Sequence, residues 1–281
     1  MSRNLIEGVT VLIHTLNNEI EIDKVLASIK LSNPDQIIVA DGSSRDGTAS
    51  IARKYATNVV ITAPGFAIQH KEALKLIKYK YLLVIEPDHI YPEGFIHNLK
   101  SELIESNFYG IQATLLSEKT NNYFERGISA FYQIHQKNKG ARAIIGGASI
   151  YLADIYLKNI ILDGFNGYSI DTRKAEIEKE KGLLVGLGYT TAYHSQELSF
   201  KSFRRKYFNY GKGDYDFYNF HKAQWNTNRK FKSITHIASR YFFNYPLELI
   251  KINKTPFIPY LWLAGIIRYT GWIYMILKIK K

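Results

Sequence analysis

The first 85 residues alternate between short apolar runs and segments with the spacing of an amphipathic helix. Residues 9–13 and 36–40 are apolar and rich in β-branched side chains, which is typical of strands buried on both faces of a sheet. Between these runs, a helix is indicated by apolar side chains spaced i, i+3, i+4, i+7: Ile22, Val25, Leu26 and Ile29. The same reasoning predicts the following further elements: helices over residues 44–55 and 68–77, and strands over residues 58–61 and 81–85.

This alternation predicts an α/β fold with a parallel sheet and right-handed crossover connections. Ligands of such sheets bind beyond the carboxyl ends of the strands. Polar side chains, with at least one carboxylate each time, follow three of the predicted strands: Thr15, Asn17 and Glu19; Asp41 and Asp46; Glu86 and Asp88. Because carboxylates gathered at one edge repel each other, the cluster predicts a metal ion or hydrogen-bond donors there. A simpler interpretation is that Asp41 and Asp46 only shape turns, since Asp-Gly pairs favour turns.

The segment DGSSRDGT at residues 41–48 is the most specific motif of the chain. It resembles, with one extra residue, the D-G-S-x-D-G-T pattern of the inverting glycosyltransferases of family 2, and the resemblance extends from about Val9 to Gly213. The resemblance implies the GT-A fold, a Rossmann-like, mostly parallel sheet with helices on both faces. It also implies a nucleotide-diphosphate sugar as donor, with Asp41 in contact with the nucleotide.

The segment TLNNE at residues 15–19 looks like the T-Y-N-x-E sequence of the same family, and the resemblance implies that Thr15, Asn17 and Glu19 belong to the donor site. Leu16 stands where the family often has a tyrosine that stacks on the base, so the base is not indicated. Lys71 stands where many members have a cation near the donor diphosphate. The alternative is that Lys71 is an ordinary solvated lysine on a helix.

Glu86, Pro87 and Asp88 stand at the position of the family's D-x-D motif. The resemblance implies a divalent metal, Mn²⁺ or Mg²⁺, held by oxygen ligands, with Asp88 as the metal ligand and Glu86 toward the donor. His194 matches a histidine that recurs in the family and is predicted to bind the metal or the diphosphate. A structural role for this lone histidine is the alternative.

Asp171 follows Ile170 where the family has its E-D motif, and the resemblance implies that Asp171 is the catalytic base. Displacement at an anomeric carbon needs a base that takes the proton from the attacking acceptor hydroxyl. As an alternative, Asp171 N-caps the helix that is predicted to begin at residue 172. The glycine-containing strand over residues 146–151 and the turn LDGF at residues 162–165 are similar to the acceptor side of the family.

Charge divides the chain into two parts. The formal net charge is +12, but residues 201–281 contain 16 Lys or Arg against 3 Asp or Glu and 20 of the 39 aromatic residues. We therefore expect a catalytic domain over residues 1–200, with a nucleotide-binding half at 1–115 and an acceptor half at 116–200, and a basic, aromatic, helical extension over 201–281. In the extension, Arg204 and Arg205 are expected to bind donor phosphates, because the planar guanidinium binds phosphate through two bonds.

Residues 260–279 are apolar apart from Arg268 and Lys278. An arginine at a bilayer centre costs about 2.5–3.5 kcal/mol, which disfavours a membrane span. The aromatic and basic side chains favour association with an anionic membrane surface, and hence a peripheral or anchored place on the cytoplasmic face and a glycan or lipid-linked acceptor. A packing helix or an oligomer interface is the alternative. The absence of cysteine excludes disulfides and thiolate chemistry and fits a cytoplasmic compartment.

Three other functions fit parts of the sequence. A nucleotidyltransferase also combines a parallel sheet, a divalent ion and a nucleotide, but usually has a glycine-rich basic signature after its first strand. Binding of nucleic acid by the basic tail is a second possibility, which its apolar density disfavours, so no nucleic acid is expected. A catalytically inactive nucleotide-binding protein is the third, because Glu86 and Ile170 depart from the family pattern.

Overall fold

The computed structural model describes residues 4–117, 119–162, 169–194 and 198–279. The residues Asp163, Gly164 and Phe165 of the predicted acceptor-side turn lie outside them. The chain forms two compact units, made up as follows: the first of residues 1–118, 138–166 and 170–196, the second of residues 119–137, 167–169 and 197–281.

The first unit is built on one sheet, with nine strands in the described residues in the order β3-β2-β1-β4-β8-β6-β9-β5, and with β7 paired to β9. The strands are β1 (Ile6–Thr15), β2 (Gln36–Asp41), β3 (Asn58–Ile61), β4 (Tyr79–Ile85), β5 (His89–Ile90), β6 (Gly110–Ser117), β7 (Gly140–Arg142), β8 (Ser149–Leu152) and β9 (Val185–His194). The helices of this unit are α1 (Glu19–Lys30), α2 (Thr48–Ala52), α3 (Phe66–Leu74), α4 (Phe95–Glu105), α6 (Ala153–Asn159) and α7 (Ile170–Glu180).

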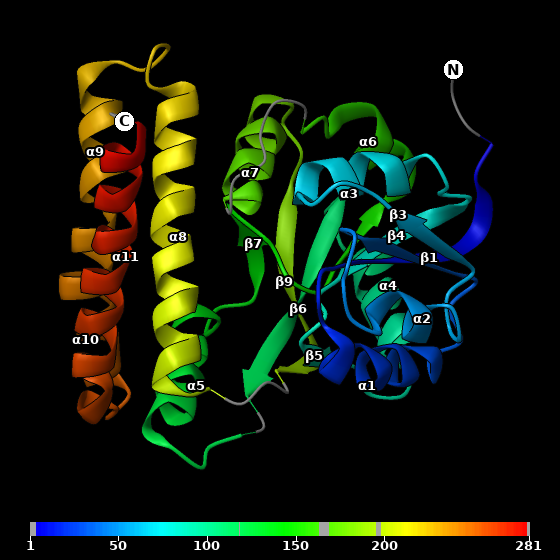
Figure 1. Cartoon of the computed structure of the whole chain (residues 1–281), viewed down its shortest axis with the longest axis horizontal. Helices are drawn as coiled ribbons and strands as arrows, with labels where there is room; N and C mark the ends of the chain where they lie inside the picture. The colour runs from blue at the N-terminus through cyan, green and yellow to red at the C-terminus, as the bar shows by residue number, and fades with distance from the viewer. Residues whose placement is uncertain (1–3, 118, 163–168, 195–197, 280–281) are drawn as a thin grey trace. The chain divides into compact units, whose positions relative to one another are not determined.

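The strands β1 to β4 are parallel, as the alternating sequence pattern predicts. Both faces of β2, and of β1 from its third residue on, are buried. This is because α3 and α6 cover one face of the sheet and α1, α2 and α4 cover the other (Figure 1). The register pairs Thr15 with Asp41, and Ile13 with both Val39 and Ile85. The polar segments that follow these strands therefore begin at the same edge of the sheet, where the sequence predicts the ligand site.

The second half of the sheet mixes directions. β8 runs antiparallel to β4 and β6, and β5 and β7 run antiparallel to β9, whereas β6 and β9 are parallel. Because β8 is reversed, its first residue, Ser149, lies opposite Val84 near the carboxyl end of β4. Gly146 and Gly147, which precede β8, are thus delivered to the same edge as the segment after β4.

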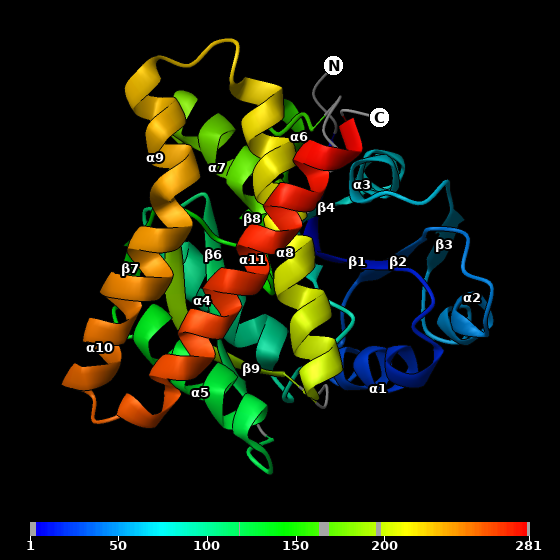
Figure 2. The ribbon, with the colours of Figure 1, turned by 60° about the vertical axis from the view of Figure 1, so that its left-hand side comes forward.

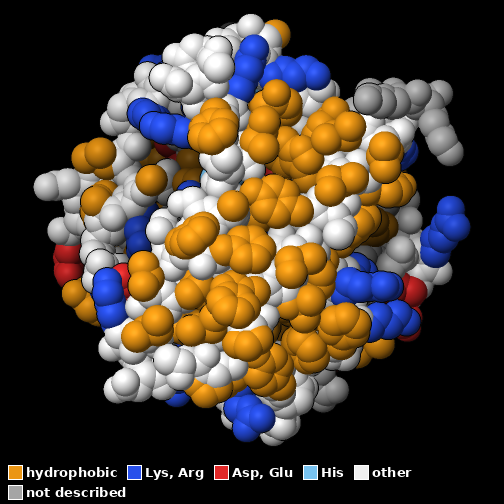
Figure 3. Space-filling model, turned by 90° about the vertical axis from the view of Figure 1, so that its left-hand side faces the viewer, with side chains coloured by type: hydrophobic (Ala, Val, Ile, Leu, Met, Phe, Trp, Pro, Cys, Tyr) orange, Lys and Arg blue, Asp and Glu red, His pale blue; other side chains and the backbone are white. Residues whose placement is uncertain are grey.

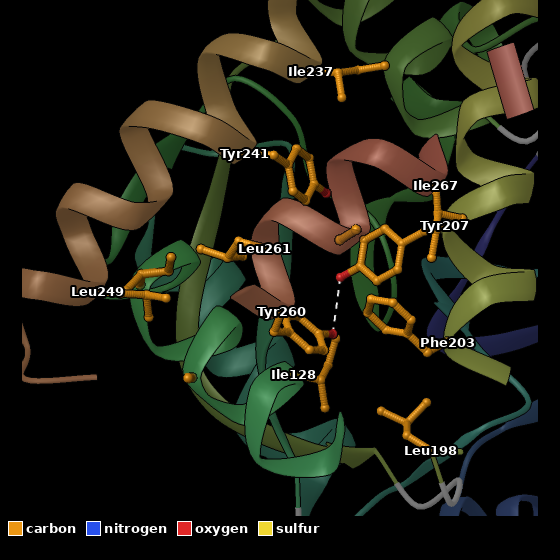
Figure 4. Close-up of a cluster of buried hydrophobic side chains, with 13 residues drawn as sticks. Ile128, Leu198, Phe203, Tyr207, Ile237, Tyr241, Leu249, Tyr260, Leu261 and Ile267 are labelled. Carbon is orange, nitrogen blue, oxygen red and sulfur yellow. Dashed lines mark hydrogen bonds between the residues drawn. The ribbon is translucent and has the colours of Figure 1, made fainter. Parts of the chain in front are cut away.

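The second unit is helical. Its elements are α5 (Tyr123–His135), α8 (Phe200–His221), α9 (Thr227–Ala238), the π-helix η1 (Ser239–Asn244), α10 (Tyr245–Lys251), the 3-10 helix η2 (Thr255–Phe257) and α11 (Ile258–Ile279). Its core gathers buried side chains from α5, α8, α9, α10 and α11 (Figure 4). Within this core the hydroxyl groups of Tyr207 and Tyr260 are hydrogen-bonded at 3.2 Å, so that each polar tip is satisfied inside an apolar surrounding.

The helices α8 and α11 pack against each other through glycines, and α11 crosses α8 in Figure 2. A Cβ atom on Gly211 would lie 1.8 Å from the carbonyl oxygen of Arg268, and one on Gly271 would lie 2.1 Å from that of Phe208. Arg268 is bound to Asp214 through two hydrogen bonds, one of 2.7 Å, and donates another to Tyr241 at 3.1 Å. The charge of Arg268, in the middle of the apolar C-terminal stretch, is thus paired within the helical unit. None of the helices over the described residues is long and apolar enough to cross a membrane.

Candidate functional site

Asp41, at the end of β2, is buried, and both of its carboxylate oxygens accept hydrogen bonds from Ser44. The hydroxyl group of Ser44 also accepts a hydrogen bond of 2.8 Å from the backbone of Asn17, and Asn17 Oδ1 accepts one of 2.8 Å from the backbone of Arg45. The two segments that resemble the donor motifs are therefore joined to each other. Thr15 Oγ1 is buried with no hydrogen-bond partner among the described residues, which leaves a polar atom for a ligand at this edge.

Asp46 shapes the turn before α2, as the simpler interpretation of this residue predicts. Its carboxylate accepts hydrogen bonds from the hydroxyl and backbone N–H of Thr48 and, at 3.2 Å, from the backbone of Glu19. The hydrogen bond from the Thr48 hydroxyl is the main reason that the pKa of Asp46 lies below its usual value. The Glu19 side chain lies against Gly47, where a Cβ atom would lie 2.5 Å from Glu19 Oε1, so Glu19 sits on the same turn.

The segment after β4 forms a group of possible metal ligands. One oxygen or nitrogen atom each of Glu86, Asp88 and His89 lies within 4.8 Å of the other two. His89 Nδ1 lies 2.7 Å from Asp88 Oδ1 and 3.5 Å from Glu86 Oε2, and His194 Nε2 lies 3.4 Å from Asp88 Oδ2. Carboxylate oxygens and imidazole nitrogens suit Mn²⁺, and carboxylates suit Mg²⁺. The residues present therefore fit a divalent metal.

The β5–β9 pairing positions the two imidazoles, because His89 and His194 are direct partners in the antiparallel register. Their rings are buried and meet edge to face with centroids 5.3 Å apart. Burial opposes ionisation of Asp88, but the charge of His89 and hydrogen bonds from both histidines outweigh it and hold the pKa of Asp88 well below its usual value. His194 thus lies beside the predicted metal ligand Asp88. His89 has no role in the sequence prediction, although it directly follows Asp88 in the chain.

Asp171 lies in the first turn of α7, against the glycines that precede β8. A Cβ atom on Gly146 would lie 2.3 Å from Asp171 Oδ2, and one on Gly147 would lie 3.7 Å from Glu86 Oε2. Gly146 and Gly147 therefore lie between Asp171, the predicted base, and Glu86, which belongs to the group of possible metal ligands. Asp171 is open to solvent on one side, yet protein atoms surround its carboxyl group closely enough to raise its pKa. The positive charge of Lys174 lowers this pKa, and the negative charge of Glu178 raises it further.

A buried polar network anchors α7 and was not indicated by the sequence. Lys174 donates hydrogen bonds to the carbonyl oxygen of Ile145, at 3.0 Å, and to the hydroxyl of Tyr151, and its Nζ lies 3.6 Å from Glu178 Oε1. Glu178 in turn accepts a hydrogen bond from the hydroxyl of Tyr109. Both charged side chains are almost fully buried. Their spacing of i, i+4 on a polar helix is an ordinary surface pattern, so the sequence does not predict their burial.

A second buried network, of three hydrogen-bonded side chains, lies next to the end of β1. His70 Nδ1 lies 3.1 Å from His14 Nε2, and His70 Nε2 lies 2.9 Å from the hydroxyl of Tyr156. Burial lowers the pKa of His14 well below its usual value and that of His70 to about 3, so both rings are neutral at physiological pH. The neighbouring residue Lys71 is exposed on α3. Its predicted contact with a diphosphate stays a prediction.

Arg204 and Arg205 lie in the first turns of α8, where both are exposed. They belong to the helical unit, whereas the other predicted site residues belong to the sheet unit. Their predicted role in binding phosphate stays a prediction.

Comparisons with known proteins bear on the family and the fold. A family model described as Glycosyl transferase family 2 matches residues 10–158. The structure of S. aureus TarS residues 1–349 is similar, with a TM-score of 0.56 at 14% identity over 94% of this chain and 89% of that chain. The mannosyltransferase PcManGT from Pyrobaculum calidifontis, solved with GDP-Man and Mn²⁺, has a TM-score of 0.57 at 14% identity over 95% and 79% of the two chains. Comparison with curated protein sequences gave no match. At these identities the similar structures show the fold.

Proposed function

We propose that this chain, which belongs to glycosyl transferase family 2 and has the GT-A fold, transfers a sugar from a nucleotide-diphosphate sugar to an acceptor hydroxyl with inversion at the anomeric carbon. The observation that supports this most directly is the arrangement around Gly146 and Gly147. These residues lie between a possible metal group at Glu86, Asp88 and His89 and a carboxylate of raised pKa at Asp171.

The donor is proposed to bind at the edge formed by the ends of β1, β2 and β4. Polar groups for a nucleotide are supplied by Asp41, Asn17 and the hydroxyl of Thr15, which has no hydrogen-bond partner in the described part of the chain. The residues that would hold the metal are Glu86, Asp88, His89 and His194. A divalent ion bound there neutralises charge on the diphosphate leaving group. Similar structures of the fold were solved with GDP-Man and Mn²⁺ and with UDP-GlcNAc, which supports a metal-dependent nucleotide-sugar donor.

In the proposed mechanism Asp171 accepts the proton of the acceptor hydroxyl as that oxygen attacks the anomeric carbon. The raised pKa brings the carboxylate closer to the pH at which a general base works best. The new bond forms on the face opposite the departing diphosphate, so the configuration inverts. Lys174, held by Ile145 and Tyr151, keeps α7 in place and thereby keeps Asp171 beside Gly146.

The acceptor is proposed to be a glycan or a lipid-linked glycan. The basic, aromatic composition of the helical unit supports a substrate that is presented at a membrane. A panel of soluble oligosaccharides and polyprenyl-linked acceptors, each incubated with the purified chain, a nucleotide sugar and Mn²⁺, separates the two kinds of acceptor.

The proposed function is tested with Asp171→Asn. We expect a loss of transfer of about 10² to 10⁴-fold, since general base catalysis contributes that much, with nucleotide binding in the presence of Mn²⁺ unchanged. A thermal-shift screen of nucleoside diphosphates, with and without Mn²⁺, measures the binding. Asp154→Asn, which changes an exposed acid on α6, is the matched control and should leave both readouts unchanged. Full transfer by Asp171→Asn would contradict the assigned base.

A further inference from the structure

The helix α11 is apolar on two opposite sides. Its inner side packs into the core of the helical unit through Tyr260, Leu261, Ala264 and Ile267. Its outer side carries exposed large apolar side chains, spaced so that they fall on one stripe of the helix: Trp262, Ile266, Ile273 and Leu277, with Tyr274 beside them. A surface helix normally has polar residues on the side that faces water. On the outer stripe of α11, the exposed polar side chain among these large apolar ones is Thr270, whose hydroxyl donates a hydrogen bond of 2.7 Å to the carbonyl oxygen of Ile267.

The neighbouring elements extend this surface. The elements α9, η1 and α10 pack against α11 and carry further exposed apolar side chains: Phe231, Ile234, Phe243, Leu247 and Ile250. We call these five residues and the five of α11 the apolar face. Figure 3 shows hydrophobic side chains gathered broadly on the side of the molecule formed by α9, α10 and α11. Contiguous exposed apolar surface of this kind marks a site of association rather than ordinary exposure of single residues.

The charges around the apolar face are almost all positive. Residues 227–279 contain eight Lys or Arg and one acid, Glu248. Glu248 is paired with Lys137 and Lys251, and Arg268 is paired inward with Asp214, so neither presents its charge freely. Exposed Lys232 and Arg240 remain, together with exposed Lys278, whose charge also acts on Asp216 of α8. Lys and Arg side chains lie around the edge of the apolar side chains in Figure 3. Such an edge repels a second copy of itself and attracts an anionic surface.

We propose that the apolar face docks the protein on an anionic lipid bilayer, with the outer stripe of α11 lying in the interface and the surrounding Lys and Arg near lipid headgroups. Apolar side chains with Trp and Tyr, surrounded by cations, match the chemistry of that interface, and each cation near an anionic leaflet adds about 1 kcal/mol. The proposed docking is at the surface of the bilayer, and none of the helices in the described part of the chain is long and apolar enough to cross it. This proposal concerns lipid binding alone and does not depend on glycosyl transfer.

The test is flotation of the purified full-length chain with two kinds of vesicle, one of phosphatidylcholine alone and one that also contains phosphatidylglycerol. We expect flotation with the anionic vesicles, with a partition constant that falls as salt is raised. The double variant Ile266→Gln/Ile273→Gln should bind about thirtyfold more weakly, because two apolar side chains of the stripe are lost. The variant Lys232→Gln/Arg240→Gln should bind about 25-fold more weakly, from about fivefold for each cation.

The matched control is Ile104→Gln/Ile161→Gln, which changes two similarly exposed isoleucines of the sheet unit, at 59% exposure each. The control should float like the unaltered chain. Thermal shifts with nucleoside diphosphates report the donor site separately, and the stripe variant should leave them unchanged. Equal flotation of the stripe variant and the control would overturn the proposal. A second result would also overturn the proposal. In it, the unaltered chain does not bind vesicles and is a dimer in light scattering, whereas the stripe variant is a monomer. The apolar face would then bind a second copy of the chain.

Discussion

The carboxyl group of Asp171 fills the space beside Gly146 in which a side chain would begin, since a Cβ atom there would lie 2.3 Å from Asp171 Oδ2. The backbone at this point is fixed, because the N–H of Gly146 donates a hydrogen bond of 2.9 Å to Gln112 Oε1. The carboxyl group would therefore have to move if residue 146 gained a side chain. The proposed base can therefore occupy its position only because residue 146 is a glycine and has no Cβ atom.

Gly146→Ala should lower kcat by about 100-fold, because a displacement of about 1 Å at a reacting group costs that much. Nucleotide binding, measured by calorimetry with Mn²⁺, should stay the same, since the atoms nearest the new Cβ are those of Asp171 and not those of the residues proposed to bind the donor and the metal. The control is Gly182→Ala, at a glycine with φ of 66° and open space around it. It should reduce stability through backbone strain without reducing kcat. Equal losses of kcat in the two variants would attribute the effect to stability.

The pH dependence of kcat/KM should show a limb on the acidic side that reports Asp171. The base must be ionised, and the protein atoms packed around its carboxyl group raise its pKa, so activity should begin to fall at a higher pH than for an ordinary aspartate. The charge of Lys174 acts against that rise, so Lys174→Met should move the limb to higher pH still. Glu178→Gln removes a like charge and should move the limb to lower pH. Rate profiles over pH 4 to 9 check both directions, and shifts of the same sign would contradict the assignment.

His89→Gln should weaken Mn²⁺ binding by about 10 to 100-fold, the range found when a metal ligand or the partner that orients it is lost. The physical reason is that His89 Nδ1 lies 2.7 Å from Asp88 Oδ1 and within the same group as Glu86. Titration of the chain with Mn²⁺, followed by electron paramagnetic resonance, measures the affinity. His97→Gln, at an exposed histidine of α4, is the control and should bind Mn²⁺ like the unaltered chain.

Breaking the ion pair between Asp214 and Arg268 should lower the free energy of unfolding of the helical unit by about 3–5 kcal/mol, because a buried charge is left unpaired. The variant Asp214→Leu/Arg268→Met removes both charges and should cost less than either single change. Burial opposes ionisation of Asp214, but Arg268 outweighs it and lowers the pKa. The pair therefore stabilises the fold above the usual pKa of an aspartate, and its contribution is lost as the pH falls through the lowered value. Urea unfolding at pH 7 and at about pH 3 checks both statements.

The sequence predicts the parallel half of the sheet closely, because each strand from β1 to β4 is a short apolar run bounded by polar residues. β3 begins and ends where the pattern places it, at Asn58 and Ile61. The antiparallel strand β8 overlaps the glycine-containing strand predicted over residues 146–151. The antiparallel strands β5 and β7 were not predicted, because they have only two and three residues and take their conformation from pairing with β9. Short strands of this kind have too few positions to show a period.

Some of the site residues could likewise be predicted from the sequence, and others could not. Thr15 and Asp41 meet at one edge because parallel register follows from the order of the elements. By contrast, Lys174 and Glu178 look like solvent-facing charges in a polar helix, and only the packing of α7 on Tyr109 and Tyr151 buries them. Arg268 is similar, since nothing near it in the sequence indicates Asp214, 54 residues earlier, as its partner. Long-range pairs of charges are determined by tertiary packing and leave no local pattern.

The two glycine contacts between α8 and α11 affect how the outer stripe of α11 can change in evolution. Gly211 against the carbonyl of Arg268, and Gly271 against that of Phe208, hold α11 at a fixed rotation and a fixed height. The outward side chains therefore contribute little to the packing that holds the helix. Selection can exchange them one by one without loss of the fold. Related chains are free to acquire a polar, basic or aromatic outer stripe on the same helical frame, so the proposed docking on lipid can change without any change in the proposed catalytic residues.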